Sequence, residues 1–226
     1  MSIRRNFPAM QRQGDPSMFD HYLRKHLERP LTRAATLADR PWLTPDRITA
    51  AGLILGLGSA ATAAAGAWWI SLALWLASRL ADGLDGPLAR LRRSRDPGRS
   101  DSGAGGFFDI TADFCVYGST VVGVAVGVTS TYGAPWWPFL LVLLAYYING
   151  TAFLAFSSIA ERTGRTLDDG RSLSFLGGLA EGAETIVVHS LWLIFATVAW
   201  QIAVVWAAVV AISALQRMVA GYRSLR

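Results

Sequence analysis

The sequence of 226 residues contains one cysteine and, over three long stretches, no charged residue at all. A single cysteine, Cys115, excludes an intrachain disulfide bond and a zinc site built from several cysteines. The first 40 residues are polar and basic and hold no apolar segment of the kind found in a cleavable signal peptide, so none is expected. These absences exclude a secreted, disulfide-stapled domain. Cys115 itself is expected to be a small apolar residue on a buried helix.

Charged residues are missing from residues 48–78, 114–160 and 185–216. A helix that crosses a bilayer needs about 20 mostly apolar residues, so each run is long enough for one or two spans. A soluble globule can bury one such run but hardly three. We therefore predict a polytopic, all-α integral membrane protein.

Glycine, proline and tryptophan residues divide each uncharged run into two helices. The dividing segments are residues 65–69, the stretch TSTYGAPWWP at 129–138, and residues 198–201. Six transmembrane helices are therefore expected, at about residues 47–66, 69–91, 106–128, 139–160, 172–197 and 202–219.

All 21 lysine and arginine residues belong to one side of this six-helix chain. They fall in residues 1–47, 79–99, 162–171 and 217–226, and the alternate turns hold none. The positive-inside rule then places both termini in the cytoplasm. The net charge of +5 is thus a topology signal, and no nucleic-acid partner is expected.

The N-terminal segment mixes apolar residues with arginine and lysine between Ser17 and Arg40. This composition suits an amphipathic helix in the headgroup plane, bent near Pro30, and a solvated basic tail is the alternative. We divide the chain into an interfacial segment, residues 1–40, and a six-helix domain, residues 41–226.

Four aspartates lie at the facing ends of the second and third predicted helices. Asp82 and Asp85 are spaced i, i+3, and Asp109 and Asp113 are spaced i, i+4, so each pair shares one helix face. Four carboxylates at the edge of hydrocarbon repel each other unless cations neutralise them. Oxygen ligands of this kind suit Mg²⁺ or Mn²⁺ rather than zinc, and two such ions are usual in phosphoryl displacement. The structural alternative is a set of ion pairs with Arg79 or Arg90.

Small residues beside the aspartates leave room for a bulky phosphorylated ligand, or else serve close helix packing. They are Gly83, Gly86, Ala89, Gly105 and Gly106.

This region resembles the signature of the CDP-alcohol phosphatidyltransferases, D-x-x-D-G-x-x-A-R, a spacer, then G-x-x-x-D-x-x-x-D. The resemblance extends to the six-helix plan, the interfacial helix and the stretch LTPDRIT at 43–49. The matching signature positions are Asp82, Asp85, Gly86, Ala89, Arg90, Gly105, Asp109 and Asp113.

The resemblance implies an enzyme that transfers a phosphatidyl group from CDP-diacylglycerol to a small alcohol and releases CMP. It implies metal ligation by Asp82, Asp85, Asp109 and Asp113, with Asp113 also the base that takes the proton of the attacking hydroxyl. It further implies a homodimer in the inner or cytoplasmic membrane, with the active site facing the cytoplasm. The positions it assigns to the CDP-lipid are Asp46, Thr49, Gly86, Ala89, Arg90, Ser102 and Gly105.

The spacer at residues 91–104 is longer than is usual in the family, and its basic part is expected to be a surface excursion over anionic headgroups. The acceptor alcohol stays open: glycerol 3-phosphate is the default, and inositol phosphate, serine and choline are alternatives. Arg165 and Arg171 are the candidates to bind an acceptor phosphate, with Arg217 on the same side.

Other polar residues within the apolar runs are given packing roles. Asn149 and His189 are expected to make hydrogen bonds inside the bundle. Glu181 and Glu184 either line the acceptor cavity or form such bonds.

Two further functions are weighed. A transporter would use the carboxylates to carry cations, but transporters place such sites near the midplane within inverted repeats, and no repeat is found here. The other is a lipid-binding homologue without activity, which the complete set of metal ligands disfavours.

Overall fold

The computed structural model describes residues 36, 39–40, 42–95, 103–163 and 182–226, and all regular elements within these residues are helices. The interfacial helix predicted before residue 40 and the start of the helix predicted at 172 lie outside the described residues. The helices are α2 (Pro45–Ala64), α3 (Trp68–Arg95), α4 (Ala104–Tyr132), α5 (Trp137–Arg162), α6 (Gly182–Ile194), a 3-10 turn (Ala196–Val198) and α7 (Ala199–Leu225).

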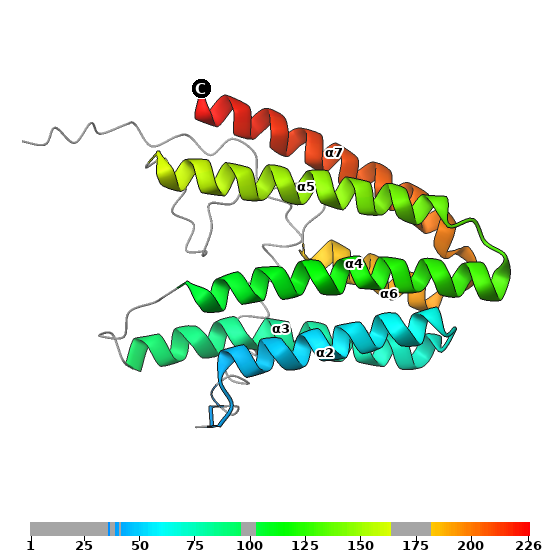
Figure 1. Cartoon of the computed structure of the whole chain (residues 1–226), viewed down its shortest axis with the longest axis horizontal. Helices are drawn as coiled ribbons and strands as arrows, with labels where there is room; N and C mark the ends of the chain where they lie inside the picture. Colours follow the sequence, from blue (N-terminus) through cyan, green and yellow to red (C-terminus); the bar gives the residue numbers. More distant parts are fainter. Residues whose placement is uncertain (1–35, 37–38, 41, 96–102, 164–181) are drawn as a thin grey trace, which may run out of the picture.

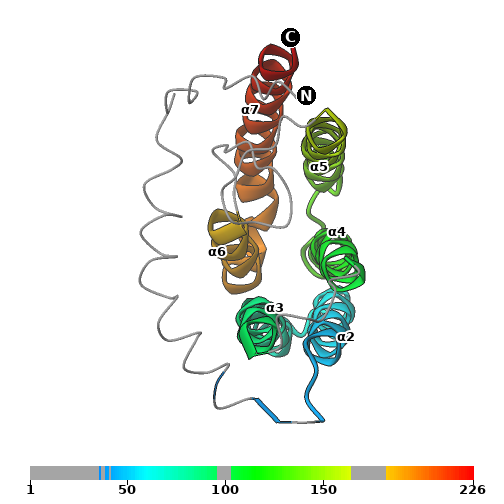
Figure 2. The ribbon, with the colours of Figure 1, turned by 90° about the vertical axis from the view of Figure 1, so that its left-hand side faces the viewer.

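The helices run side by side along the long axis of the molecule (Figure 1). Seen from the end, α2, α3 and α4 form one group, α5 and α7 form another, and α6 lies between α3 and α7 (Figure 2). Helix α2 packs extensively on both α3 and α4, whereas the described residues of α3 and α4 have few or no close backbone contacts with each other. The space between α3 and α4 is therefore occupied by their side chains.

Four helical segments are long and apolar enough to cross a membrane: α2, α4, α5 and residues 196–225. Large apolar side chains such as Ile54, Leu144 and Val205 are exposed on their outer faces, as contact with lipid requires. Helix α3 does not meet the criterion, and the described part of α6 has only 13 residues. The chain is an integral membrane protein that is all-helical in its described residues, while the count of six spans and the side of the termini stay predictions.

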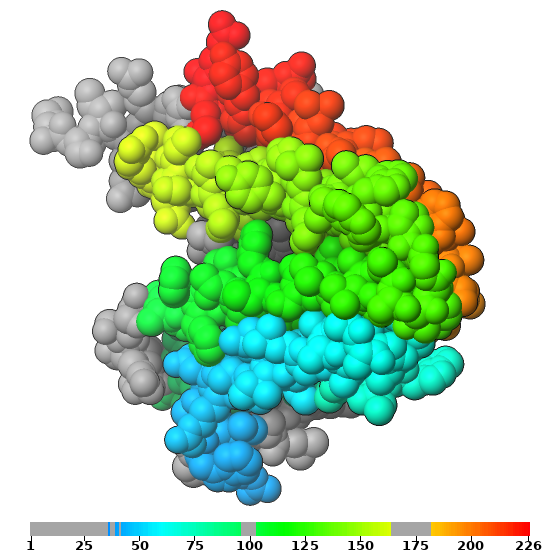
Figure 3. Space-filling model, turned by 45° about the vertical axis from the view of Figure 1, so that its right-hand side comes forward, coloured from blue at the N-terminus to red at the C-terminus, as the bar shows by residue number. Residues whose placement is uncertain are grey.

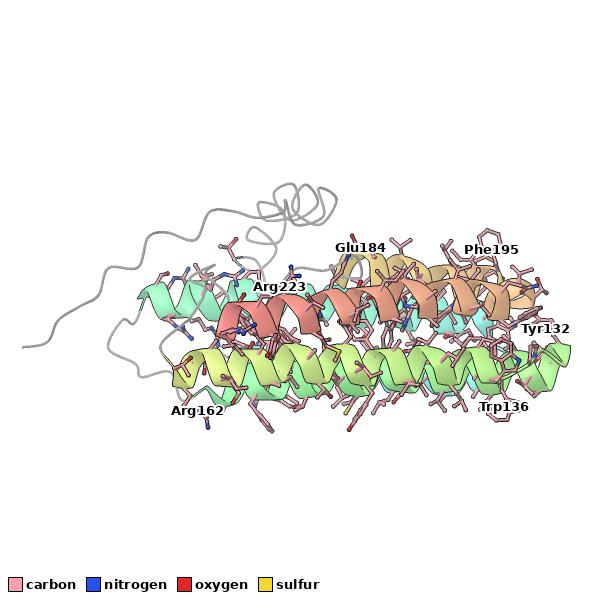
Figure 4. The ribbon with its side chains drawn as sticks, turned by 90° about the horizontal axis from the view of Figure 1, so that it is seen from above. Tyr132, Trp136, Arg162, Glu184, Phe195 and Arg223 are labelled. Carbon is pink, nitrogen blue, oxygen red and sulfur yellow. The ribbon has the colours of Figure 1, made fainter. Side chains whose placement is uncertain are left out.

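The first two turns fall within the segments expected from the sequence, but the third lies at residues 195–198, because residues 199–201 already belong to α7. Gly66, the last residue of the first predicted helix, lies in the turn after α2, and Gly133 lies in the turn after α4. Their φ values of 74° and 65° are ones that a glycine adopts without strain. Tyr132, Trp136 and Phe195 lie at one end of the bundle, and Arg162 and Arg223 lie toward the other (Figure 4). The fifth predicted helix ends three residues early, because α6 stops at Ile194 before the 3-10 turn.

Two predictions are wrong, the burial of Cys115 and the loop expected to begin at residue 92. Cys115 is exposed on the outer face of α4 and not buried, because an apolar side chain in a membrane can face lipid as well as core. The start of the basic spacer is no surface excursion, since Arg92, Ser94 and Arg95 continue α3 by a full turn. The remainder of the spacer, residues 96–102, lies outside the described residues.

Arg92 ties the entry of α2 to the end of α3. Its Nε donates to Asp39 Oδ1 at 3.0 Å, and its Nη2 donates to the carbonyl oxygens of Arg40 and Leu43 at 2.8 and 3.0 Å. Arg95 also pairs with Asp39. The hydrogen bond from Arg92 is the main cause that holds the pKa of Asp39 below its usual value. The segment before α2 and the end of α3 thus form one unit.

Helices α2 and α4 touch backbone to backbone. A Cβ atom placed on Gly123 would lie 2.2 Å from the carbonyl oxygen of Ala60, and one on Gly127 would lie 2.0 Å from that of Ala63. Only glycine allows this approach, which resembles the packing of small residues in other membrane helices. The two glycines therefore fix how α4 lies on α2.

Replacing Gly127 by alanine is expected to lower the free energy of unfolding by about 1–3 kcal/mol, because the helices must separate to admit the methyl group. For a chain of this size, each kcal/mol lowers the thermal midpoint by about 2–4 °C, which can be measured on the protein in detergent micelles. The matched control is Gly118→Ala on the same helix, where an added Cβ meets no atom within 4 Å. If both variants melt like the wild type, the close approach of α2 and α4 is wrong.

Candidate functional site

The four aspartates face each other across the space between α3 and α4. Asp82 lies against Asp113, and Asp85 lies against Asp109, so each carboxyl group of α3 meets one of α4. Asp85 is 6% exposed, and the side chains of Asp82 and Asp113 are 29% and 31% exposed. The convergence expected from the spacing is thus present as two facing pairs.

Helix α2 adds a hydroxyl group to this arrangement. Thr44 caps α2 by accepting a hydrogen bond from the backbone N–H of Arg47 at 3.3 Å, and Pro45 begins the helix. One turn later, Thr49 is buried, and its Oγ1 donates to Asp85 Oδ2 at 2.5 Å. Thr49, assigned to the CDP-lipid by resemblance, therefore contacts one of the candidate metal ligands directly.

Arg79 is the cation within the site. Its Nη1 lies 2.6 Å from Asp113 Oδ1 and 3.7 Å from Asp82 Oδ2. The sequence named Arg79 only as an alternative ion-pair partner and assigned it no part in the site. The signal that would have found it is its place three residues before Asp82, on the same helix face and at the end of an uncharged run.

The donor set suits a hard divalent cation, because it consists of carboxylate oxygens held by two facing helices. Within the described residues, no three of the acidic, histidine or cysteine side chains lie close enough together to enclose an ion. The carboxylates stand in pairs, and Arg79 occupies the side of the Asp82–Asp113 pair. The chemistry of the ligands fits Mg²⁺ or Mn²⁺, and metal binding by these residues stays a proposal.

Other residues assigned to the CDP-lipid lie around the aspartates. Asp46 at the start of α2 approaches Gly105 in the first turn of α4, since a Cβ on Gly105 would lie 3.4 Å from Asp46 Oδ1. Gly86 lies beside the guanidinium of Arg90, and Ala89 is half-buried on the same turn of α3. Ser102, Arg165, Arg171 and Glu181 lie outside the described residues.

A buried polar and aromatic cluster lies farther along the bundle. His189 of α6 is fully buried, and its Nε2 lies 2.9 Å from the hydroxyl of Tyr146, which accepts a hydrogen bond from Trp206 Nε1 at 2.7 Å. The packing role predicted for His189 is confirmed. Asn149 differs, because its buried Oδ1 has no hydrogen-bond partner within the described residues. Glu184 lies half-buried in the first turn of α6.

The chain is similar to known proteins in sequence. The family model of the CDP-alcohol phosphatidyltransferases matches residues 42–215. The inner membrane protein YnjF of Escherichia coli is 33% identical over 184 residues, which cover 79% of this chain and 82% of that protein.

A solved structure is also similar. The phosphatidylinositol phosphate synthase of Mycobacterium tuberculosis, crystallised with CDP-DAG bound, matches with a TM-score of 0.64 and 20% identity. The match covers 86% of this chain and 94% of the synthase. At this identity, the likeness shows a shared fold.

The bond between Thr49 and Asp85 yields a stability test. Thr49→Val leaves a buried carboxylate without its hydroxyl donor and is expected to reduce the free energy of unfolding by about 1–3 kcal/mol. Thr49→Ser keeps the donor and is expected to stay close to the wild type. The measurement is the thermal midpoint of both variants in the same detergent. Equal midpoints for valine and serine would show that the bond does not hold Asp85.

Proposed function

This chain belongs to the CDP-alcohol phosphatidyltransferase family of phosphotransferases, and on that premise we propose that it joins a CDP-activated lipid to a small polar alcohol. In the proposed reaction, the alcohol attacks the phosphatidyl phosphorus of CDP-diacylglycerol, and CMP leaves. The observation that carries the proposal is the facing of Asp82 and Asp85 with Asp109 and Asp113 across the space between α3 and α4.

Two features support CDP-diacylglycerol as the donor. The Mycobacterium tuberculosis synthase with the same fold was solved with CDP-DAG bound. The site also lies between helices whose outer faces are apolar, so acyl chains can stay in the bilayer while the nucleotide reaches the carboxylates.

Divalent cations are proposed to bind at the four aspartates, as two ions of Mg²⁺ or Mn²⁺. When bound, they would offset the negative charge of the diphosphate as its bridging P–O bond breaks and CMP leaves. Asp82, Asp85, Asp109 and Asp113 would hold them. Their side chains come from both α3 and α4, so a bound cation would be held by residues of both helices.

Asp113 is also proposed to act as the base in the transfer step. A carboxylate oxygen of Asp113 takes the proton of the acceptor hydroxyl while the new P–O bond forms. The P–O bond to the CMP phosphate breaks at the same phosphorus, and its electron pair leaves with CMP. Asp113 suits this role because its side chain is 31% exposed, whereas Asp85 is nearly enclosed.

The nucleotide is proposed to lie where the first turns of α2 and α4 meet the last turns of α3. Asp46 and Gly105 adjoin each other there, and Gly86 lies beside Arg90, which is exposed and free to reach a phosphate. Thr49, Ala89 and Ser102 complete the proposed contacts with the CDP-lipid.

The acceptor is proposed to be glycerol 3-phosphate, with inositol phosphate, choline and serine as alternatives. Arg165 and Arg171 are the proposed ligands of an acceptor phosphate. We further propose that the active site faces the cytoplasm and that the protein is a homodimer. A transporter has no support from the comparisons.

Asp113→Asn is expected to lower the rate of CMP release from CDP-diacylglycerol by about 10²–10⁴-fold, because the amide cannot take up the hydroxyl proton. The assay uses purified protein in lipid nanodiscs with Mg²⁺ and measures CMP by chromatography. Asp39→Asn is the matched control, since Asp39 lies outside the cluster and contacts Arg92 and Arg95. Normal turnover by Asp113→Asn would remove the assignment of the base.

A panel of acceptors identifies the alcohol. Labelled CDP-diacylglycerol is incubated with glycerol 3-phosphate, inositol phosphate, choline or serine, and the lipid products are separated by thin-layer chromatography. Glycerol 3-phosphate is expected to give phosphatidylglycerophosphate, and excess EDTA is expected to abolish the product because the cations are removed. Product formation at full rate in EDTA would contradict the metal assignment. An inactive wild type with every acceptor would favour a lipid-binding homologue.

A further inference from the structure

Arg79 is held rigidly within the site. Its side chain is 5% exposed, and its guanidinium carbon lies 5.2 Å from the centre of the Trp75 ring and 4.8 Å from that of Tyr117. Nη2 also donates to Ser78 Oγ at 3.1 Å. Both rings offer the negative faces that attract a cation. The guanidinium is therefore fixed between α3 and α4.

The aromatic rings that hold Arg79 are themselves fixed by α6. His189 stacks on Trp75 with ring centres 4.9 Å apart and meets the edge of Tyr117 at 5.7 Å. Trp75 is fully buried, and its Nε1 donates to the carbonyl oxygen of Ile186 at 3.4 Å. Side chains of α3 and α4 thus contact the guanidinium directly, and α6 packs against the two rings that face it.

The position of Arg79 gives the two aspartate pairs different surroundings. Its positive charge lies against Asp113 and Asp82, whereas Asp85 accepts hydrogen bonds from two neutral donors, the hydroxyl of Thr49 and the backbone N–H of Gly86. A fixed positive charge lowers the affinity of neighbouring carboxylates for a further cation. It also occupies Oδ1 of Asp113 and leaves Oδ2 as the oxygen for other partners.

Stability alone does not account for a buried arginine here. A buried ion pair gains little over well-packed apolar side chains, because both charges lose their hydration. Within the described residues, Arg79 Nε is buried without a hydrogen-bond partner, which adds to that penalty.

We propose that Arg79 is a positioning residue and the resident counter-cation of the Asp82–Asp113 pair. It orients Asp113 so that one carboxylate oxygen faces the acceptor hydroxyl, and it weakens divalent-cation binding at that pair relative to the Asp85–Asp109 pair. This proposal rests on the function proposed above for the same site.

The test separates cation binding from catalysis in the full-length protein in nanodiscs. Mn²⁺ binding is measured by electron paramagnetic resonance without substrate. Arg79→Gln is expected to bind Mn²⁺ about tenfold more tightly, since the competing charge is gone. Its kcat is expected to fall by about 10–100-fold while the KM for CDP-diacylglycerol stays near that of the wild type.

Arg79→Lys keeps the charge but not the two-armed guanidinium. It is expected to bind Mn²⁺ like the wild type and to show a kcat between those of the wild type and Arg79→Gln. Arg217→Gln is the matched control for loss of a buried arginine, because Arg217 is 6% exposed and lies over the ring of Phe153. Its Mn²⁺ affinity is expected to be unchanged.

Weaker or unchanged Mn²⁺ binding by Arg79→Gln, or an unchanged kcat, overturns the proposal. If that variant does not fold, Arg79→Lys decides: a lowered kcat with unchanged Mn²⁺ affinity supports the proposal, and a wild-type kcat overturns it. If the wild type releases no CMP with any acceptor, the proposed function fails, whereas the Mn²⁺ titration still decides whether Arg79 competes with the cation.

Discussion

Burying acidic groups within an apolar bundle is the constraint on which the site depends. Two acidic helix faces meet between α3 and α4, and isolated charges in such surroundings carry a large desolvation penalty. The protein meets this penalty with three kinds of partner: a hydroxyl on Asp85, a guanidinium on Asp82 and Asp113, and the divalent cations proposed here. Each partner comes from a different source, and together they explain why so many polar groups converge in one region.

Helices α5, α6 and α7 support the site through a series of contacting side chains that ends at Trp75. Tyr146, His189 and Trp206 connect α5, α6 and α7 through hydrogen bonds, and Trp75 links His189 to the guanidinium of Arg79. Helices α5 and α7 are therefore connected to Arg79 through aromatic side chains and His189, and not through charged groups. Helices α4 and α5, by contrast, meet near the turn between them and stand apart toward their other ends (Figure 3). The bundle is thus closely packed where α6 meets α3 and α7, and more open between α4 and α5.

Much of this was readable from the sequence, because helical spacing decides which side chains share a face. The intervals within each aspartate pair predicted the convergence, and the uncharged runs predicted helices in a membrane. The spacing of residues along one helix does not show which other helix a given face packs against. The pairing of Arg79 with Asp113 therefore emerged only when α3 and α4 were seen together. The exposure of Cys115 was missed for a related reason, since lipid and protein core accept the same apolar side chains.

Arg92 illustrates a second limit. A run of arginines before a proline and a glycine indicates a loop, and yet Arg92 lies in α3 and binds the backbone just before α2. Arg92 binds the carbonyl oxygens of Arg40 and Leu43, which lie 52 and 49 residues earlier in the chain. Sequence patterns within one helix carry no trace of such distant partners.

Helix α2 contributes no aspartate to the facing pairs, but it determines how far apart they stand. It contacts α4 backbone to backbone at Gly123 and Gly127, and it contacts α3 through Thr49 and through Ser78, which donates to the carbonyl oxygen of Gly52 at 2.7 Å. Since α3 and α4 meet through side chains and have few or no close backbone contacts, the way each packs on α2 determines the width of the space between them. Although none of the four facing aspartates lies on α2, a change along this helix alters the gap across which the carboxylates face each other.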